Sequence, residues 1–288
     1  MSRIKKVLFK FWFILLTKLK SFDKQTVVFQ GGIGSQILSF IEYKEKTKNL
    51  RMPISANFDY FLNITEDFVD KHGLSRWAWK LDHYGIKQSD MFQNSKIKKL
   101  VNKYLRVRQS NRSEIFYNFR ELKSASYINL FPVQQTKINA YLQSIFESKK
   151  VQFCVIHIRR GDYLKVASKV TTLEEVCKLI EKIRYLIPNN ILIASDSELN
   201  TFEKLLLDQS LVGLKYFYID PKESPFLVHD LMRASKVLIA SNSTFSFSAG
   251  LLANDDCLIF FPTKYFGEGS AQDSQAFIFR QPFDYLLG

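Results

Sequence analysis

Residues 151–163 read VQFCVIHIRRGDY, an apolar run that ends abruptly in charged and polar residues. The apolar part, Val151 to Ile158, has the character of a buried β-strand, and Arg159 and Arg160 follow it at once. Strands buried on both faces are typical of parallel sheets, and ligands of such sheets bind beyond the carboxyl ends of the strands. The segment therefore predicts a sheet type and the edge at which a site should lie.

The sequence that follows this strand alternates between strand and helix patterns. Further strands are expected at 191–194, 216–219, 237–240 and 257–260, with helices at 172–185, 198–207, 225–234 and 245–252. Such alternation is typical of a parallel, doubly wound α/β sheet. A helix followed by a polar stop precedes it, which predicts a boundary near residue 148 between an N-terminal domain, 25–148, and a C-terminal domain, 149–288.

Small polar loops follow the predicted strands on one rim of the sheet. They are Gly31–Gln36 (GGIGSQ), His157–Tyr163, Ser195–Ser197 and Ser241–Thr244. Hydroxyls and backbone N–H groups at the start of a helix can bind phosphate without a cation. Adjacent arginines would add bidentate, charge-assisted bonds to a diphosphate. The loops together predict a pocket for a nucleotide diphosphate.

Each of these features alone has an ordinary structural explanation. GGIGSQ lacks the final glycine of a dinucleotide fingerprint, because residue 37 is isoleucine. A histidine inside an apolar strand, such as His157, is more often a hydrogen-bonded core residue than a catalyst. Serine, asparagine and aspartate are preferred helix caps, which would account for the loop at Ser241 and for Asp196. Only their coincidence at one rim favours the pocket.

The composition indicates an anionic partner. The net charge is +13, which suits nucleic acid, a phospholipid surface or a substrate that carries phosphates. A nucleic-acid-binding module is the alternative from another class, although the sequence shows no RRM, KH or zinc motif. Three isolated cysteines favour a reducing compartment, and no histidine stands at zinc spacing, so no metal site is expected.

The first 24 residues form a separate basic segment with seven lysines and arginines and one aspartate. Its apolar stretch, Phe11–Leu16, is far shorter than the ~20 residues that a membrane span needs. Interleaved lysines and aromatic residues predict a basic amphipathic helix on an anionic membrane surface. A helix docked on its own domain is the alternative. The membrane reading places the protein at the cytoplasmic face, as a peripheral protein.

The segment from His157 to Tyr163 resembles the H-x-R-R-G-D-Y signature of the α-1,2-fucosyltransferases, glycosyltransferase family eleven. Three further segments agree: ASDS at 194–197 is similar to the family's S-D-D, SNSTFSFSAGLLAN at 241–254 to S-N-S-T-F-S-W-W-A-A-W-L, and GGIGSQ to G-G-L-G-N-Q. The resemblance covers residues 27–40 and most of 151–262. It departs from the family at Phe247 and Ser248, where two tryptophans are usual, and at Ser35, where asparagine is usual.

The resemblance implies a GT-B-like architecture, in which two Rossmann-like domains face a cleft. It implies inverting transfer of L-fucose from GDP-β-L-fucose, bound to the C-terminal domain, with no required metal. The acceptor would be a hydroxyl of a glycan, with galactoside O2 favoured, and the basic segment suggests a lipid-linked repeat of a surface polysaccharide or O-antigen. Use of another GDP-sugar is the alternative within the same class.

Roles for individual residues follow from the same resemblance. Arg159 and Arg160 would bind the diphosphate, and His157 would sit beside the nucleoside. Asp196 would accept hydrogen bonds from guanine, while Asp162 would act as the base or fix an arginine. The remaining predicted donor contacts come from hydroxyls, amides and the glycine loop: Ser243, Thr244, Ser246, Gly32, Gly34 and Gln36. Because the sequence has no D-x-D motif, arginine is expected to stabilise the charge on the leaving group in place of a metal.

Overall fold

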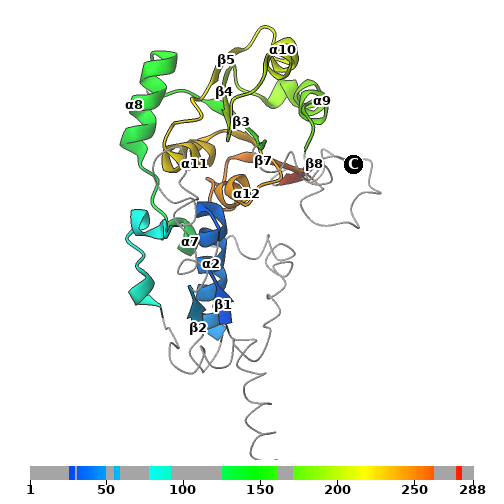
Figure 1. Ribbon diagram of the computed structural model, residues 1–288. Coiled ribbons are helices and arrows are strands. Elements are labelled where there is room, and N and C mark those ends of the chain that lie inside the picture. The colour runs from blue at the N-terminus through cyan, green and yellow to red at the C-terminus, as the bar shows by residue number, and fades with distance from the viewer. Residues whose placement is uncertain are drawn as a thin grey trace, which may run out of the picture. The chain divides into compact units, whose positions relative to one another are not determined.

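The computed structural model describes residues 26–29, 31–49, 55–58, 78–91, 125–148, 150–160, 171–262 and 277–280 (Figure 1). The chain divides into two compact units, Met1–Asp70 with Leu74–Ile115 and Lys71–Gly73 with Phe116–Gly288. The amphipathic helix predicted for residues 1–24 lies outside the described residues. The placement of two domains around a cleft likewise stays a prediction.

The second unit contains a six-stranded sheet with the order β5-β4-β3-β6-β7-β8. Its first five strands in the chain are parallel, and β8 pairs antiparallel with β7. The strands are β3 (Phe153–Ile158), β4 (Asn190–Ser195), β5 (Lys215–Tyr218), β6 (Val237–Ile239), β7 (Leu258–Pro262) and β8 (Phe277–Arg280). This arrangement confirms the predicted α/β class with a central parallel sheet. The edge strand β8 was not predicted, because strand–helix alternation reveals only parallel strands joined by helices.

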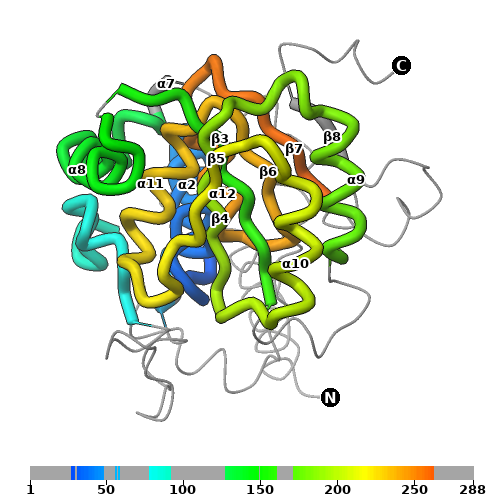
Figure 2. The backbone as a smooth tube through the Cα atoms, turned by 90° about the horizontal axis from the view of Figure 1, so that it is seen from above, coloured from blue at the N-terminus to red at the C-terminus, as the bar shows by residue number. Residues whose placement is uncertain are grey.

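Helices cover both faces of this sheet (Figure 2). On one face lie α9 (Leu173–Ile183) and α10 (Thr201–Ser210), whose apolar residues share a core with Cys154, Ile156 and Ile158 of β3. On the other lie α11 (Pro225–Ala234) and α12 (Thr244–Leu251). A short 3₁₀ turn, η5 (Arg184–Leu186), follows α9. Side chains alternate between the two faces along a strand, so neighbouring residues of β3 meet different helices.

Capping boxes define where α9 and α10 begin. In α9, Thr172 Oγ1 accepts from Glu175 N (3.2 Å), and Glu175 Oε2 accepts from Thr172 N (2.8 Å). In α10, Asn200 and Glu203 make the same pair of bonds, each 2.9 Å long. Both boxes satisfy N–H groups that a helix start otherwise leaves without partners. The Asn200 cap explains why α10 begins at Thr201, three residues later than the pattern predicts.

The second unit begins earlier in the chain than the predicted boundary near residue 148. It includes α7 (Ala125–Ile128) and α8 (Gln135–Phe146). Gln134 N, at the start of α8, donates to Asp230 Oδ2 of α11 (3.0 Å). At its other end, the Phe146 ring lies 5.2 Å from the Phe217 ring of β5. Helix α8 thus packs with the sheet although it precedes the sheet in the chain. The polar residues after Phe146 predict a domain boundary there and give no sign of this packing.

The first unit pairs β1 (Thr26–Val28) in parallel with β2 (Ser55–Asn57), and α2 (Ile33–Asn49) connects them in the chain. Helix α2 begins at Ile33, within the GGIGSQ segment, and Gly32 O accepts from Gln36 N in its first turn. Phe29 stacks on Phe58, and two 3₁₀ turns follow Trp79, η1 (Leu81–Tyr84) and η2 (Gln88–Asp90). In the described part of the chain, no helix has the length and apolarity to cross a membrane.

Candidate functional site

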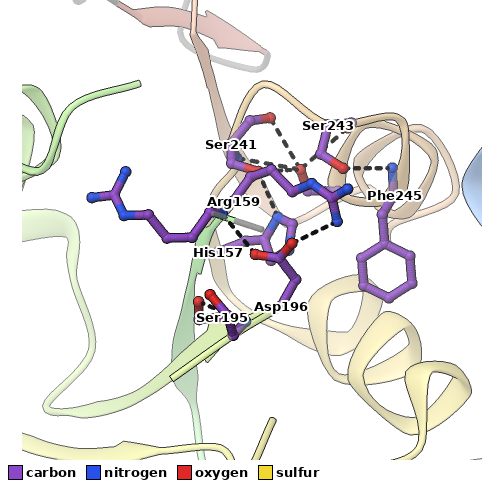
Figure 3. A network of polar contacts seen from close by, with 10 residues as sticks. His157, Arg159, Ser195, Asp196, Ser241, Ser243 and Phe245 are labelled. Carbon is purple, nitrogen blue, oxygen red and sulfur yellow. Dashed lines mark hydrogen bonds and ion pairs between the residues drawn. The ribbon is translucent and has the colours of Figure 1, made fainter. Parts of the chain in front are cut away.

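Three of the polar loops predicted from the sequence meet at the carboxyl edge of the second unit's sheet. β3 lies between β4 and β6, with Ile158 aligned with Ser195 and Ile156 with Ile239. The loops that follow these strands therefore emerge side by side, and Figure 3 shows their side chains gathered there. This is the edge at which parallel sheets bind ligands.

Asp196, directly after β4, is the centre of the charged part of the site. Its Oδ1 accepts from the backbone N of Arg160 (2.6 Å), and its Oδ2 lies 2.8 Å from Arg159 Nη1. The Arg159 side chain keeps 17% of its surface exposed. In Figure 3 it extends across the site toward the Asp196 carboxylate, on the side of the start of α12. Asp196 thus holds Arg159 in place, with both of its oxygens engaged by the loop after β3.

Arg160 points in another direction. Its Nε lies 2.8 Å from Glu203 Oε1 in the first turn of α10, and its Nη1 donates to Thr171 O (3.4 Å). The Nε–H is not aligned for a hydrogen bond, so the contact with Glu203 is an ion pair. The sequence predicts that both guanidiniums converge on one diphosphate beside the start of α12. In the structure, the Arg160 guanidinium lies against α10 instead. Adjacent residues of an extended chain face opposite sides, which sends Arg160 to the α10 face.

His157 is a buried member of β3, 4% exposed. Its Nδ1 lies 2.7 Å from Ser241 Oγ, and its ring lies 5.6 Å from the ring of Phe245. Burial and, secondly, the charge of Arg159 lower its pKa to about 3, so the imidazole is neutral at physiological pH. This is the environment of a hydrogen-bonded core histidine; the contact with a nucleoside stays a prediction.

The serines of the loop before α12 hold one another. Ser243 is the N-cap of α12, and its Oγ accepts from Phe245 N (3.2 Å). Ser246 is fully buried; its Oγ accepts from Ser241 N (3.2 Å) and donates to Ser241 O (3.1 Å). The predicted phosphate contact of Ser246 would require these bonds to be exchanged. Thr244, the first residue of α12, is partly exposed, and a rigid loop thus presents this helix start to the site.

Four further predicted site residues are not among the described residues of the second unit. Asp162 is outside the described residues, so its role stays a prediction. Gly32, Gly34 and Gln36 belong to the first unit. Gln36 Nε2 donates to Gly31 O (2.9 Å) and Ala78 O (3.0 Å), and its Oε1 accepts from Lys80 N (2.8 Å). Its amide therefore fastens two segments of that unit, and a donor contact stays a prediction.

Two residues of the site were not found from the sequence. Glu203 pairs with Arg160. The sequence pattern that indicates Glu203 is the capping-box motif N-x-x-E, in which the glutamate follows Asp196 by seven residues. Phe245 lies between two imidazoles, with its ring 5.6 Å from that of His157 and 5.3 Å from that of His229. Phe245 is part of the SNSTFS segment, but the sequence pattern assigns no role to its ring. Within the described ranges, no cluster of histidine, cysteine or acidic residues is placed to hold a metal ion.

The geometry places one partly exposed guanidinium beside a helix start at the carboxyl edge of an α/β sheet, and groups of these two kinds can bind an anion. The model of Glycosyl transferase family 11 matches residues 61–281. The chain therefore belongs to glycosyltransferase family 11 and is a glycosyltransferase. No curated protein matches it.

Solved structures similar to parts of the chain include three crystal structures of POFUT1. One complex with GDP-fucose has a TM-score of 0.35 at 11% identity, over 47% of this chain and 49% of that one. A complex with GDP has a TM-score of 0.33 at 12% identity, over 45% and 48%. A second GDP-fucose crystal form has a TM-score of 0.34 at 10% identity, over 80% and 71%. The chain spans about half the length of the first two, and the assignment rests on the family match instead.

The low pKa of His157 makes a prediction about stability. An unfolded histidine titrates near pH 6.5, whereas the folded pKa is about 3, so the folded state binds fewer protons between these values. The stability that neutral His157 contributes is complete above about pH 6.5 and is lost as the pH falls toward 3. His157→Asn removes this titration. Its loss of stability relative to the wild type should therefore shrink from pH 7 to pH 4.5, as measured by urea unfolding; an equal loss at every pH contradicts this.

Proposed function

We propose that the protein transfers L-fucose from GDP-β-L-fucose to a hydroxyl of a glycan, with inversion and without a metal ion. The observation that carries the proposal is the placement of Arg159: Asp196 holds its guanidinium at the ligand-binding edge of the sheet. Membership of glycosyltransferase family 11 supports sugar transfer. The H-x-R-R-G-D-Y match around Arg159 supports GDP-fucose as the donor.

The chemistry requires positive charge at the leaving group. Transfer breaks the bond between the sugar C1 and the phosphate oxygen, which leaves negative charge on GDP and an oxocarbenium-like sugar. A guanidinium fixed beforehand stabilises that charge more in the transition state than in the ground state. Arg159 would supply it together with the N–H groups at the start of α12, because a helix N-terminus also favours anions.

Inversion follows from attack on the face opposite to GDP. The acceptor oxygen forms the new bond to C1 as the phosphate oxygen leaves, which converts the β-linked donor into an α-L-fucoside. The hydroxyl proton passes to a base or to solvent. Asp162 is our candidate for this base because it is the carboxylate nearest to the arginine pair in the sequence, and an ion pair with one of these arginines is its alternative role. Galactoside O2 is our candidate acceptor position.

The natural acceptor would be lipid-linked. The basic residues of segment 1–24 suit an anionic surface, which would bring the enzyme to the cytoplasmic face of the membrane, where repeats of a surface polysaccharide or O-antigen are assembled on lipid. The support for this part of the proposal is the charge and aromatic pattern of the segment alone.

The selectivity of nucleotide binding tests the identity of the donor substrate. Calorimetry should show that GDP binds and that ADP and UDP bind more weakly, with no change on addition of EDTA. Mass spectrometry should detect a fucosylated product from GDP-fucose and a panel of galactosides. A product only from GDP-mannose would replace fucose by another sugar, and salt-dependent RNA binding without preference for GDP would refute the transferase.

Arg159 should matter most for turnover. Arg159→Ala is expected to lower kcat by about 10²–10³-fold, the scale seen when one preorganised donor to a developing negative charge is removed. Arg184→Ala is the matched control, because this exposed arginine of the same unit bonds only to carbonyls in the described structure, those of Ser210 and Val212. Steady-state kinetics and a thermal melt check both variants. Near-normal kcat in Arg159→Ala would remove the basis of the proposal.

Deleting residues 1–24 tests the membrane part. The shortened protein should leave the membrane fraction and lose retention on vesicles that contain anionic phospholipid, because the clustered lysines and arginines are gone. Its kcat with a soluble acceptor should be unchanged. Equal membrane fractionation of both forms would show that the segment does not bind the membrane.

A further inference from the structure

Glu203 uses its two carboxylate oxygens for different purposes. Its Oε2 accepts from Asn200 N (2.9 Å) and so closes the capping box of α10. Its Oε1 lies 2.8 Å from Arg160 Nε. The side chain is only 18% exposed and that of Arg160 only 6%. Glu203 therefore joins the start of α10 to the loop that carries both arginines.

The chain of contacts continues from Arg160 to Arg159. The backbone N of Arg160 donates to Asp196 Oδ1 (2.6 Å), and Asp196 Oδ2 pairs with Arg159 Nη1 (2.8 Å). Arg160 is thus held at both ends, by Glu203 at its guanidinium and by Asp196 at its backbone. The orientation of Arg159 depends on the same carboxylate, so a change at Glu203 has a direct route to Arg159.

The cap of α10 does not by itself require this charge, and α9 begins with a box of the same kind. In α9, Thr172 and Glu175 form the same box with bonds of 3.2 Å and 2.8 Å. A capping box needs one acceptor oxygen, and glutamine serves as well as glutamate. The charge of Glu203 therefore matters for Arg160. A buried guanidinium that loses its partner is strongly unfavourable, and Arg160 would then compete for Asp196, to which its own backbone is already bonded.

We propose that Glu203 is a positioning residue for the transfer reaction: by pairing with Arg160, it leaves the Asp196 carboxylate to orient Arg159. This inference rests on the proposed function of Arg159 at the diphosphate. It gives the two adjacent arginines different tasks. Arg159 faces the donor, and Arg160 is an anchor on the opposite face of the sheet that keeps Arg159 aligned.

Glu203→Gln tests the inference, with Glu175→Gln as the matched control. Both changes keep a capping oxygen and remove one charge from the first turn of a helix. Glu203→Gln should lower kcat by roughly 10–100-fold, since misplacing a catalytic group by about 1 Å costs up to 10²-fold, whereas KM for the acceptor stays the same. Glu203→Gln should lower the melting temperature more than Glu175→Gln, because it also removes the charged partner of the buried Arg160 guanidinium. Glu175→Gln should keep the wild-type kcat.

A double variant tests the competition directly. In Glu203→Gln with Arg160→Gln, the released charge is gone, so Asp196 should again be free to orient Arg159. The kcat of the double variant should lie closer to the wild type than that of Glu203→Gln alone. A double variant slower than Glu203→Gln would overturn the inference, because Arg160 would then act on the donor itself.

The two proposals fail in different ways. If the wild type transfers fucose and Glu203→Gln matches Glu175→Gln in kcat, only the positioning role of Glu203 is refuted. If the wild type transfers no sugar from any GDP-sugar and does not bind GDP, the proposed function is refuted and the role of Glu203 with it.

Discussion

The alternation of side chains along β3 is the constraint on which the site depends. Residues 155, 157 and 159 share the face covered by α11 and α12, and residues 156, 158 and 160 share the face covered by α9 and α10. His157 therefore meets Ser241 and Phe245, whereas Ile156 and Ile158 join the core beneath α9 and α10. The same rule separates Arg159 from Arg160. The alternation of side chains along β3 thus accounts for the core beneath α9 and α10, for the burial of His157 and for the different directions of Arg159 and Arg160.

Ion pairs then stabilise the different directions of the two arginines. Two guanidiniums in consecutive positions repel each other, and each needs a carboxylate if it is to remain partly or fully buried. Asp196 and Glu203 provide one carboxylate for each. Both acids come from the segment that runs from the end of β4 into the first turn of α10, and parallel pairing of β3 with β4 places that segment beside the arginines. Arg159 and Arg160 are thereby held before any ligand arrives, which is what electrostatic stabilisation of a leaving group requires.

Hydroxyl groups give the α12 side of the site the same rigidity. Ser241, Ser243 and Ser246 bond to one another and to the backbone of their own loop, and Ser241 also bonds to His157. Because burial keeps that histidine neutral, the positive charge at this end of β3 comes from Arg159 and not from His157. The loop is held by short internal bonds, so the helix start that follows it need not be ordered by a substrate.

The sequence by itself determined the parallel α/β sheet and the edge of the site, because burial patterns and strand–helix alternation are local properties of the chain. It also determined the family, through the motif around His157 and Arg159. Tertiary structure alone decided which partner each charged residue takes. Arg160 pairs with Glu203, and Asp196 bonds to the backbone of Arg160 and pairs with Arg159, while its contact with guanine stays a prediction. Packing of α8 on α11, through Gln134 and Asp230, was equally hidden. These contacts join residues from 36 to 96 positions apart in the chain, so only the folded chain brings them within hydrogen-bond distance.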